Sequence, residues 1–99
     1  MTDFENKVYL ALIVDDNEIN LEILSNYLEA AGLAVMTVVD GESAVKVLYS
    51  QDFQFDLMFL DSTLFGISGL KVVNHLRTAN TRNVDLPIIM QTAKTSDIN

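Results

Sequence analysis

The chain is predicted to fold as a single α/β domain, in which a parallel sheet is covered by helices on both faces. Short apolar runs of strand length alternate with longer stretches whose apolar residues recur at helical spacing. The runs at 7–14, 56–60 and 87–91 are largely apolar, as expected of strands buried on both faces of a sheet. Because strands and helices alternate, right-handed crossovers would join the strands in parallel.

Composition supports this class and excludes others. The 99 residues are 49% hydrophobic and 20% charged, which is ordinary for one globular domain, and we expect residues 1–99 to form it. The formal net charge of −8, with only six basic residues, argues against nonspecific binding to nucleic acid or to an anionic membrane. The chain has no cysteine, which excludes disulfides and thiolate metal sites.

The expected location is the cytoplasm. No apolar stretch reaches the roughly 18 residues that a membrane-spanning helix needs. The first seven residues also lack the basic and apolar regions of a signal peptide.

In the first half of the chain, the strand at 7–14 is followed by a helix predicted over 19–31. Asn17 is its expected N-cap, and Gly32 stands where a helix often ends in a left-handed residue. A second strand is predicted over 33–39, and Asp40-Gly41 is expected to turn the chain into a short helix over 42–49. The apolar residues expected to face inward from these helices are Leu21, Leu24, Tyr27, Leu28, Ala31, Ala44, Val45, Val47 and Leu48.

In the second half, a third strand at 56–60 leads through a loop to a helix over 69–78, capped by Ser68. Its apolar face is expected to carry Leu70, Val73 and Leu76. A polar loop at 80–85 precedes the fourth strand, and residues 94–99 resemble the start of a further helix. The solvated faces of the helices are expected to carry His75, Lys46, Lys71 and Arg77. Packing roles are expected for the tyrosines and for three methionines: Tyr9, Tyr27, Tyr49, Met36, Met58 and Met90.

Three of the predicted strands run directly into a carboxylate or hydroxyl side chain. Asp15 and Asp16 follow the first strand, Asp61 follows the third, and Thr92 follows the fourth. The carboxyl ends of parallel strands share one edge of a sheet, where ligands bind. Oxygen ligands without histidine or cysteine suit Mg²⁺. The alternative is that Asp15 and Asp16 only cap the first helix and Asp61 only begins a turn.

Such an edge is also suited to phosphoryl chemistry. A carboxylate beside Mg²⁺ can attack a phosphoryl group and form an aspartyl phosphate. The transferred group carries charge on three oxygens, which need the metal and hydrogen-bond donors. The hydroxyl of Thr92 and the backbone N–H groups after Asp61 and at Ala93 are candidate donors.

These residues resemble the receiver domains of bacterial two-component response regulators. The resemblance rests on Val14-Asp15-Asp16-Asn17 and on the segments 60–69 and 87–93, and it covers nearly the whole chain. It implies a flavodoxin-like, doubly wound parallel sheet with the strand order 2-1-3-4 in this chain. The run at 16–20 is similar to receivers of hybrid kinases and phosphorelays.

The resemblance also implies roles for the site residues. Asp61 would accept a phosphoryl group from a histidine kinase or a histidine phosphotransfer protein. Thr92 would be the switch hydroxyl, and the backbone N–H of Ala93 would contact the phosphoryl group. The Mg²⁺ ligands would be Asp16, Asp61 and the backbone carbonyl of Thr63, with Asp15 acting through water or orienting ligands. The domain would act in signalling and not as a turnover enzyme.

The sequence departs from the family at several positions. Phe65 stands where proline is usual, and Gln91 where an aliphatic residue is usual. The family continues through a fourth helix, a fifth strand ending in lysine and a fifth helix, which this sequence lacks. We therefore expect a C-terminally incomplete receiver: a fragment, a domain completed by a partner or its own copy, or a natural truncation. The exposed edge of the fourth strand, with Ile88, Ile89 and Met90, would favour self-association.

Three other functions are alternatives to that of a phosphoacceptor. A pseudo-receiver would bind a protein without useful phosphorylation, and Phe65 and the absent lysine favour it. An aspartate-nucleophile phosphatase fits less well, because its first strand resembles Asp-x-Asp whereas Asn17 holds the third place here. A flavodoxin is weaker still, because no phosphate-binding loop follows the first strand.

Overall fold

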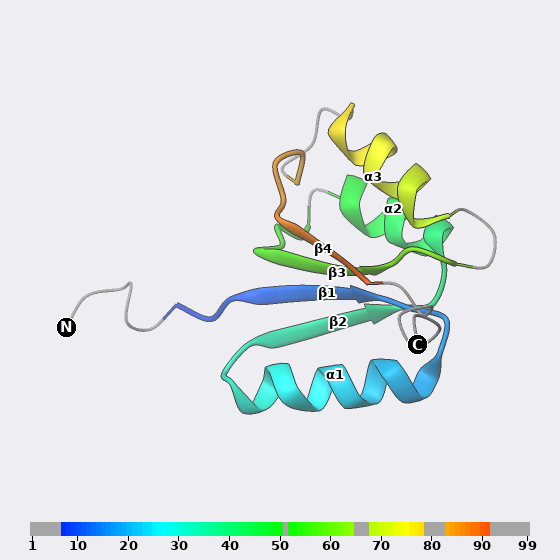
Figure 1. The fold of residues 1–99 in the computed structure, drawn as a ribbon. Coiled ribbons are helices and arrows are strands. Elements are labelled where there is room, and N and C mark those ends of the chain that lie inside the picture. Colours follow the sequence, from blue (N-terminus) through cyan, green and yellow to red (C-terminus); the bar gives the residue numbers. More distant parts are fainter. Residues whose placement is uncertain (1–6, 51, 65–67, 79–82, 92–99) are drawn as a thin grey trace.

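Within residues 7–50, 52–64, 68–78 and 83–91, which the computed structural model describes, the chain forms one four-stranded sheet. The strands are β1 (Leu10–Val14), β2 (Ala34–Val38), β3 (Leu57–Asp61) and β4 (Ile88–Gln91). They lie in the order β2-β1-β3-β4 and all neighbours pair in parallel (Figure 1). The predicted fold class and strand order are confirmed.

Three helices cover the two faces of this sheet in the described part of the chain. They are α1 (Glu18–Ala30), α2 (Gly41–Tyr49) and α3 (Gly69–Arg77). Helix α1 lies on one face, and α2 and α3 lie side by side on the other (Figure 1). None of the described helices is long and apolar enough to cross a membrane.

The main core lies between the sheet and the pair α2 and α3. It consists of fully or almost fully buried aliphatic side chains from β1, β3 and these helices: Leu12, Val14, Ala44, Leu48, Met58, Leu60, Val72 and Leu76. Alternate residues of β1, Ala11 and Ile13, are equally buried and point to the other face. Both faces of β1 are therefore covered, which explains why its sequence is apolar without alternation.

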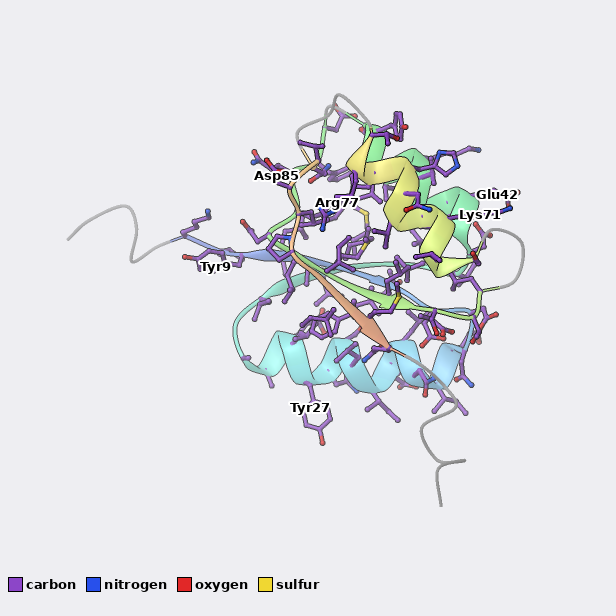
Figure 2. The ribbon with its side chains drawn as sticks, turned by 45° about the horizontal axis from the view of Figure 1, so that its top comes forward. Tyr9, Tyr27, Glu42, Lys71, Arg77 and Asp85 are labelled. Carbon is purple, nitrogen blue, oxygen red and sulfur yellow. The ribbon has the colours of Figure 1, made fainter. Side chains whose placement is uncertain are left out.

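Several predicted core positions are wrong. On α3, Leu70 is 63% exposed, and Val72 is buried in its place. On α1, Tyr27 is 72% exposed and points away from the sheet (Figure 2). Met90 is also exposed, because β4 is the edge strand of the described sheet. Helical spacing alone does not show how wide the covered stripe of a helix is, and this explains the errors on α1 and α3.

Local capping sets the helix starts. The side chains of Asn17 and Ser68 accept hydrogen bonds from backbone N–H groups in the first turns of α1 and α3, as predicted. Asp40, expected only to turn the chain, is the N-cap of α2, and its Oδ1 accepts from the N–H of Ser43 at 2.7 Å. Gly32, with a φ of 97°, follows α1 in the expected left-handed conformation.

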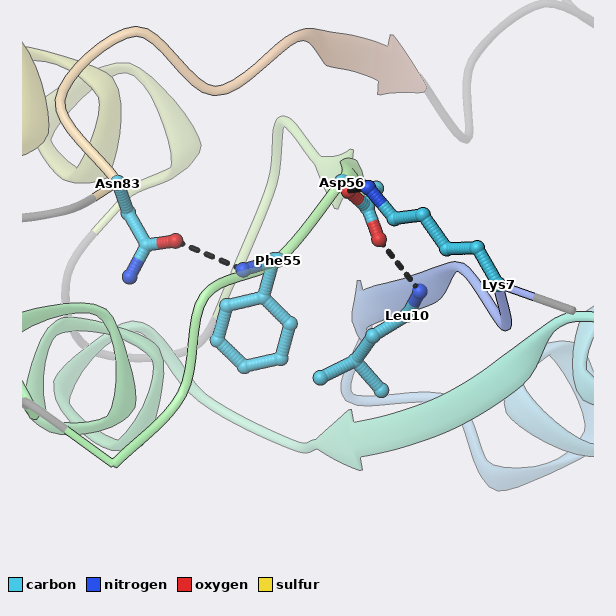
Figure 3. Close-up of polar contacts among 5 residues, drawn as sticks. All are labelled: Lys7, Leu10, Phe55, Asp56 and Asn83. Atoms are coloured by element: carbon cyan, nitrogen blue, oxygen red, sulfur yellow. Dashed lines mark hydrogen bonds and ion pairs between the residues drawn. The ribbon is translucent and has the colours of Figure 1, made fainter. Parts of the chain in front are cut away.

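Long-range polar contacts hold the amino end of the sheet. The backbone N–H of Leu10 donates to Oδ2 of Asp56 at 2.8 Å, and Nζ of Lys7 lies 3.7 Å from Oδ1 of the same carboxylate (Figure 3). Asn83 is 1% exposed, although it belongs to a loop predicted to be polar. Its side chain contacts the backbone of Phe55 (Figure 3) and also that of Phe53, and this joins the loop before β4 to the segment before β3.

Arg77 was expected to be a solvated side chain, but it also makes specific contacts with the backbone. Its guanidinium donates to the backbone carbonyls of Val84 at 2.7 Å and Leu86 at 2.9 Å. The side chain reaches from the last turn of α3 to the segment that leads into β4 (Figure 2). His75, by contrast, is exposed as predicted.

Candidate functional site

Three carboxylates meet at the carboxyl edge of the sheet. Asp15 follows β1 directly and Asp61 is the last residue of β3, and these strands are neighbours with Val14 paired to Leu60. One carboxylate oxygen from each of Asp15, Asp16 and Asp61 lies within 4.8 Å of the others. Asp15 and Asp61 are buried, whereas Asp16 is exposed. The structure therefore brings together the acids that the strand ends predicted.

Asp15 is held by the start of α1. Its Oδ1 accepts from the backbone N–H of Asn17 at 2.9 Å, and its Oδ2 accepts from the side-chain amide of Asn20 at 3.4 Å. Burial raises the pKa of Asp15, and the charges of Asp61 and Asp16 raise it further, whereas the contacts with Asn17 and Asn20 oppose the shift. The net rise means that the surroundings of Asp15 disfavour its charged form. A cation bound beside the carboxylate would favour that form.

Asp61 is oriented by the residue two positions after it. Both the backbone N–H of Thr63, at 3.0 Å, and its hydroxyl, at 3.2 Å, donate to Oδ1 of Asp61. The next residue, Ser62, is hydrogen-bonded to the edge strand β4, because its N–H donates to the carbonyl of Gln91 at 2.8 Å. Since both Thr63 contacts end on one oxygen, the carboxylate has a defined rotation before any ligand arrives.

A hollow of about 350 Å³ opens beside this cluster. Its walls come from α1 and from the ends of β1, β3 and β4, and the residues are Asp15, Asn20, Ile23, Leu24, Tyr27, Asp61 and Gln91. Asn20 and Gln91 are not among the site residues that the sequence predicts. The available signals were the spacing of Asn20 from Asn17 on the helix and the polar side chain of Gln91 at the end of an apolar strand.

The other predicted site residues are Thr63, Thr92 and Ala93. Thr63 lies beside Asp61, as its contacts show, and its backbone carbonyl as a metal ligand stays a prediction. Thr92 and Ala93 lie outside the described residues, as do Phe65 and the helix start expected at 94–99.

Comparisons with known proteins agree on one family. The model of the response regulator receiver domain matches residues 11–99. The response regulator SaeR of Staphylococcus epidermidis is 35% identical over 86 residues, which are 87% of this chain and 35% of SaeR. The hybrid signal transduction histidine kinase L of Dictyostelium discoideum is 33% identical over 88 residues, which are 88% of this chain and 5% of the kinase. The chain thus spans about a third or less of the length of these curated relatives.

Solved structures give the same result. A CheY-like receiver domain from Methylobacillus flagellatus has a TM-score of 0.79 at 25% identity and covers 94% of this chain and 76% of that one. The response regulator TrrA of Thermotoga maritima, solved in complex with Mg²⁺–BeF, has a TM-score of 0.77 at 33% identity. The match covers 92% of this chain and 77% of the TrrA chain. With its sheet order, its edge of carboxylates and the match over residues 11–99, the chain belongs to the response regulator receiver domain family.

Proposed function

We propose that this domain accepts a phosphoryl group on Asp61 in a two-component or phosphorelay system, with Mg²⁺ as the cofactor. The observation that carries the proposal is the convergence of Asp15, Asp16 and Asp61, whose ligand oxygens lie within 4.8 Å of one another. Acids this close repel each other by roughly 1–4 kcal/mol per pair at about 4 Å. A hard cation bound by oxygen ligands offsets that repulsion.

The residues present suit such a cation. Asp16 and Asp61 would hold Mg²⁺ together with the backbone carbonyl of Thr63, and Asp15 would orient ligands or act through water. When bound, Mg²⁺ would neutralise charge on the phosphoryl oxygens. The buried position of Asp15, with its raised pKa, makes a nearby positive charge favourable.

The proposed step is the transfer of a phosphoryl group to the Asp61 carboxylate. A carboxylate oxygen attacks phosphorus, the P–N bond of a phosphohistidine donor breaks, and the imidazole leaves with the electron pair and takes up a proton. Thr63 would hold Oδ1 of Asp61 during the attack, as it does in the resting site. The hydroxyl of Thr92 and the backbone N–H of Ala93 are the proposed donors to the new aspartyl phosphate.

The proposed donor is a histidine kinase or a histidine phosphotransfer protein. The solved complex of the histidine kinase ThkA with TrrA supports this class of partner, since TrrA in it is 34% identical to this chain. The domain would then act in signalling in the cytoplasm and not as a turnover enzyme. With a net charge of −8, it would not itself bind nucleic acid or a membrane surface.

Labelling with acetyl phosphate tests the proposal. We expect intact mass spectrometry to show one added phosphoryl group in the presence of Mg²⁺ and none in EDTA. Asp61→Asn should abolish the product, whereas Asp52→Asn, which changes an exposed acid elsewhere, should not. Labelling that survives Asp61→Asn, or that proceeds equally in EDTA, would contradict the proposal.

The pseudo-receiver is the second candidate, and Phe65 in place of the usual proline favours it. In that case calorimetry would detect Mg²⁺ binding to the acid cluster, but no donor would label Asp61. The two candidates therefore differ in one measurement on the same sample.

Self-association through β4 stays a prediction. Ile89 and Met90 are exposed on this edge strand of the described sheet. Sedimentation at increasing protein concentration should show a rising average mass. A constant monomer mass at high concentration would refute it.

A further inference from the structure

The first residue of α3, Gly69, lies against the backbone of the proposed phosphoacceptor. Gly69 is buried, and a Cβ built on it would lie 2.5 Å from the carbonyl oxygen of Asp61 and 2.9 Å from Cα of Ser62. Ordinary contacts between such atoms are roughly 3.5–4.0 Å. Both neighbours are backbone atoms, so no side-chain rotation could make room. Any larger residue at 69 must move α3 or the Asp61–Ser62 peptide.

The Asp61–Ser62 peptide is held by hydrogen bonds to neighbouring elements. The N–H of Gly69 donates to the carbonyl of Ser62 at 3.4 Å, and the N–H of Ser62 donates to the carbonyl of Gln91 at 2.8 Å. Ser62 is thus held between the start of α3 and the end of β4. The Thr63 contacts with Oδ1 of Asp61 begin one residue later. A shift of the Asp61–Ser62 peptide would therefore move the carboxylate relative to Asp15.

We propose that Gly69 is a positioning residue for the acid cluster. Because it has no Cβ, α3 can begin directly against the Asp61–Ser62 peptide, and this contact sets where the Asp61 carboxylate lies relative to Asp15 and Asp16. The expected effect on Mg²⁺ rests on the proposed function, whereas the effect on position does not. Gly69 itself touches no reacting atom in this scheme.

The test is the Mg²⁺ affinity of Gly69→Ala, measured by calorimetry and corrected for the folded fraction seen by circular dichroism. We expect affinity to fall about tenfold, as is common when a group that orients a metal ligand is changed. Labelling by acetyl phosphate at saturating Mg²⁺ should also slow, because the carboxylate is displaced.

Two matched variants separate positioning from general stability. Gly32 has a φ of 97° and nothing within 4 Å of a built Cβ, so Gly32→Ala strains the backbone without altering the site. Leu70→Ala changes the exposed neighbour of Gly69 in the same turn. We expect both variants to bind Mg²⁺ like the wild type. An unchanged affinity in Gly69→Ala, or an equal loss in Gly32→Ala, would overturn the inference.

Two further conditions keep the test decisive. If Gly69→Ala folds poorly, all proteins are titrated in trimethylamine N-oxide, which favours the folded state. If the wild type binds no Mg²⁺, the proposed function fails, but amide NMR spectra without metal still test the position of the carboxylate. Gly69→Ala should then shift the amide of Asn17, which donates to Asp15 on the neighbouring strand. Shifts confined to α3 and Ser62 would overturn the inference.

Discussion

Asn83 and Phe55 are joined by a buried hydrogen bond, in which the backbone N–H of Phe55 donates to Oδ1 of Asn83 at 2.8 Å (Figure 3). The amide nitrogen of Asn83 donates to the carbonyls of Leu48 and Phe53, each at 3.1 Å. One side chain thus satisfies backbone groups from the last turn of α2 and from the connection between α2 and β3, which lie 28 to 35 residues away in the sequence. It holds the amino ends of β3 and β4 side by side, and this helps to set the register that pairs Asp61 with Gln91 at the other end.

Replacing Asn83 should be costly for stability. Asn83→Ala leaves the buried N–H of Phe55 and the carbonyls of Leu48 and Phe53 without these partners, so we expect a loss of about 2–4 kcal/mol in the free energy of unfolding. Urea denaturation followed by circular dichroism measures it. Asn74→Ala, at an exposed position of α3, is the control and should change stability by less than about 0.5 kcal/mol. Equal midpoints for the two variants would contradict the prediction.

The guanidinium of Arg77 should contribute more than an ordinary surface charge. Arg77→Met keeps most of the aliphatic stem but removes the donors to Val84 and Leu86, and we expect a loss of about 1–2 kcal/mol. Lys71→Met removes an exposed positive charge from the same helix and should be nearly neutral. The measurement is the midpoint of urea denaturation of each variant relative to the wild type. If they were equally stable, the contacts of Arg77 would be energetically unimportant.

The cap of α2 should make stability depend on pH. Hydrogen bonds from Ser43 lower the pKa of Asp40 below its usual value. The ionised cap therefore stabilises the fold above the unfolded pKa of about 3.9, and this contribution is lost as the pH falls through the lower folded pKa.

The matched variant is Asp40→Asn, because asparagine caps a helix about as well but carries no charge. The wild type should be more stable than Asp40→Asn near neutral pH, and the difference should shrink toward zero as the pH falls through the lowered folded pKa of Asp40. Denaturation midpoints over this pH range measure the difference. A difference that is independent of pH would show that the charge of Asp40 plays no part.

The acid cluster should destabilise the fold when no metal is bound and stabilise it when Mg²⁺ is bound. Asp15 has a raised pKa, so the folded state holds its proton more tightly than the unfolded state, and ionised Asp15 destabilises the fold at neutral pH. Asp15→Asn should therefore raise stability in EDTA by on the order of 1 kcal/mol. The gain should fade as the pH drops through the raised pKa of Asp15, because the wild-type carboxyl then becomes neutral.

Mg²⁺ should reverse this order. Binding to the folded state raises the stability of the wild type, whereas Asp15→Asn should respond much less because it has lost a carboxylate. Thermal unfolding in EDTA and in excess Mg²⁺ measures both effects. Asp52→Asn, at an exposed position elsewhere, should behave like the wild type. A variant less stable than the wild type in EDTA would refute the electrostatic argument.

Three features could be predicted from the sequence alone: the order of the elements, their parallel arrangement and the common edge for Asp15, Asp16 and Asp61. These features follow from local rules: apolar runs form buried strands, caps start helices, and parallel strands end on the same side. Helix starts at Asn17 and Ser68 were predictable for this reason.

The roles of Asn83, Arg77 and Gly69 could not be predicted and became visible only in the folded protein. Each depends on atoms that come close through folding: Phe55 for Asn83, Leu86 for Arg77, and the backbone of Asp61 for Gly69. The same holds for the exposure of Tyr27 and Leu70, because a helical repeat does not say how far the neighbouring sheet extends beneath it. Periodicity reports which face of an element is apolar, whereas the packing of segments distant in sequence determines what that face and its ends contact.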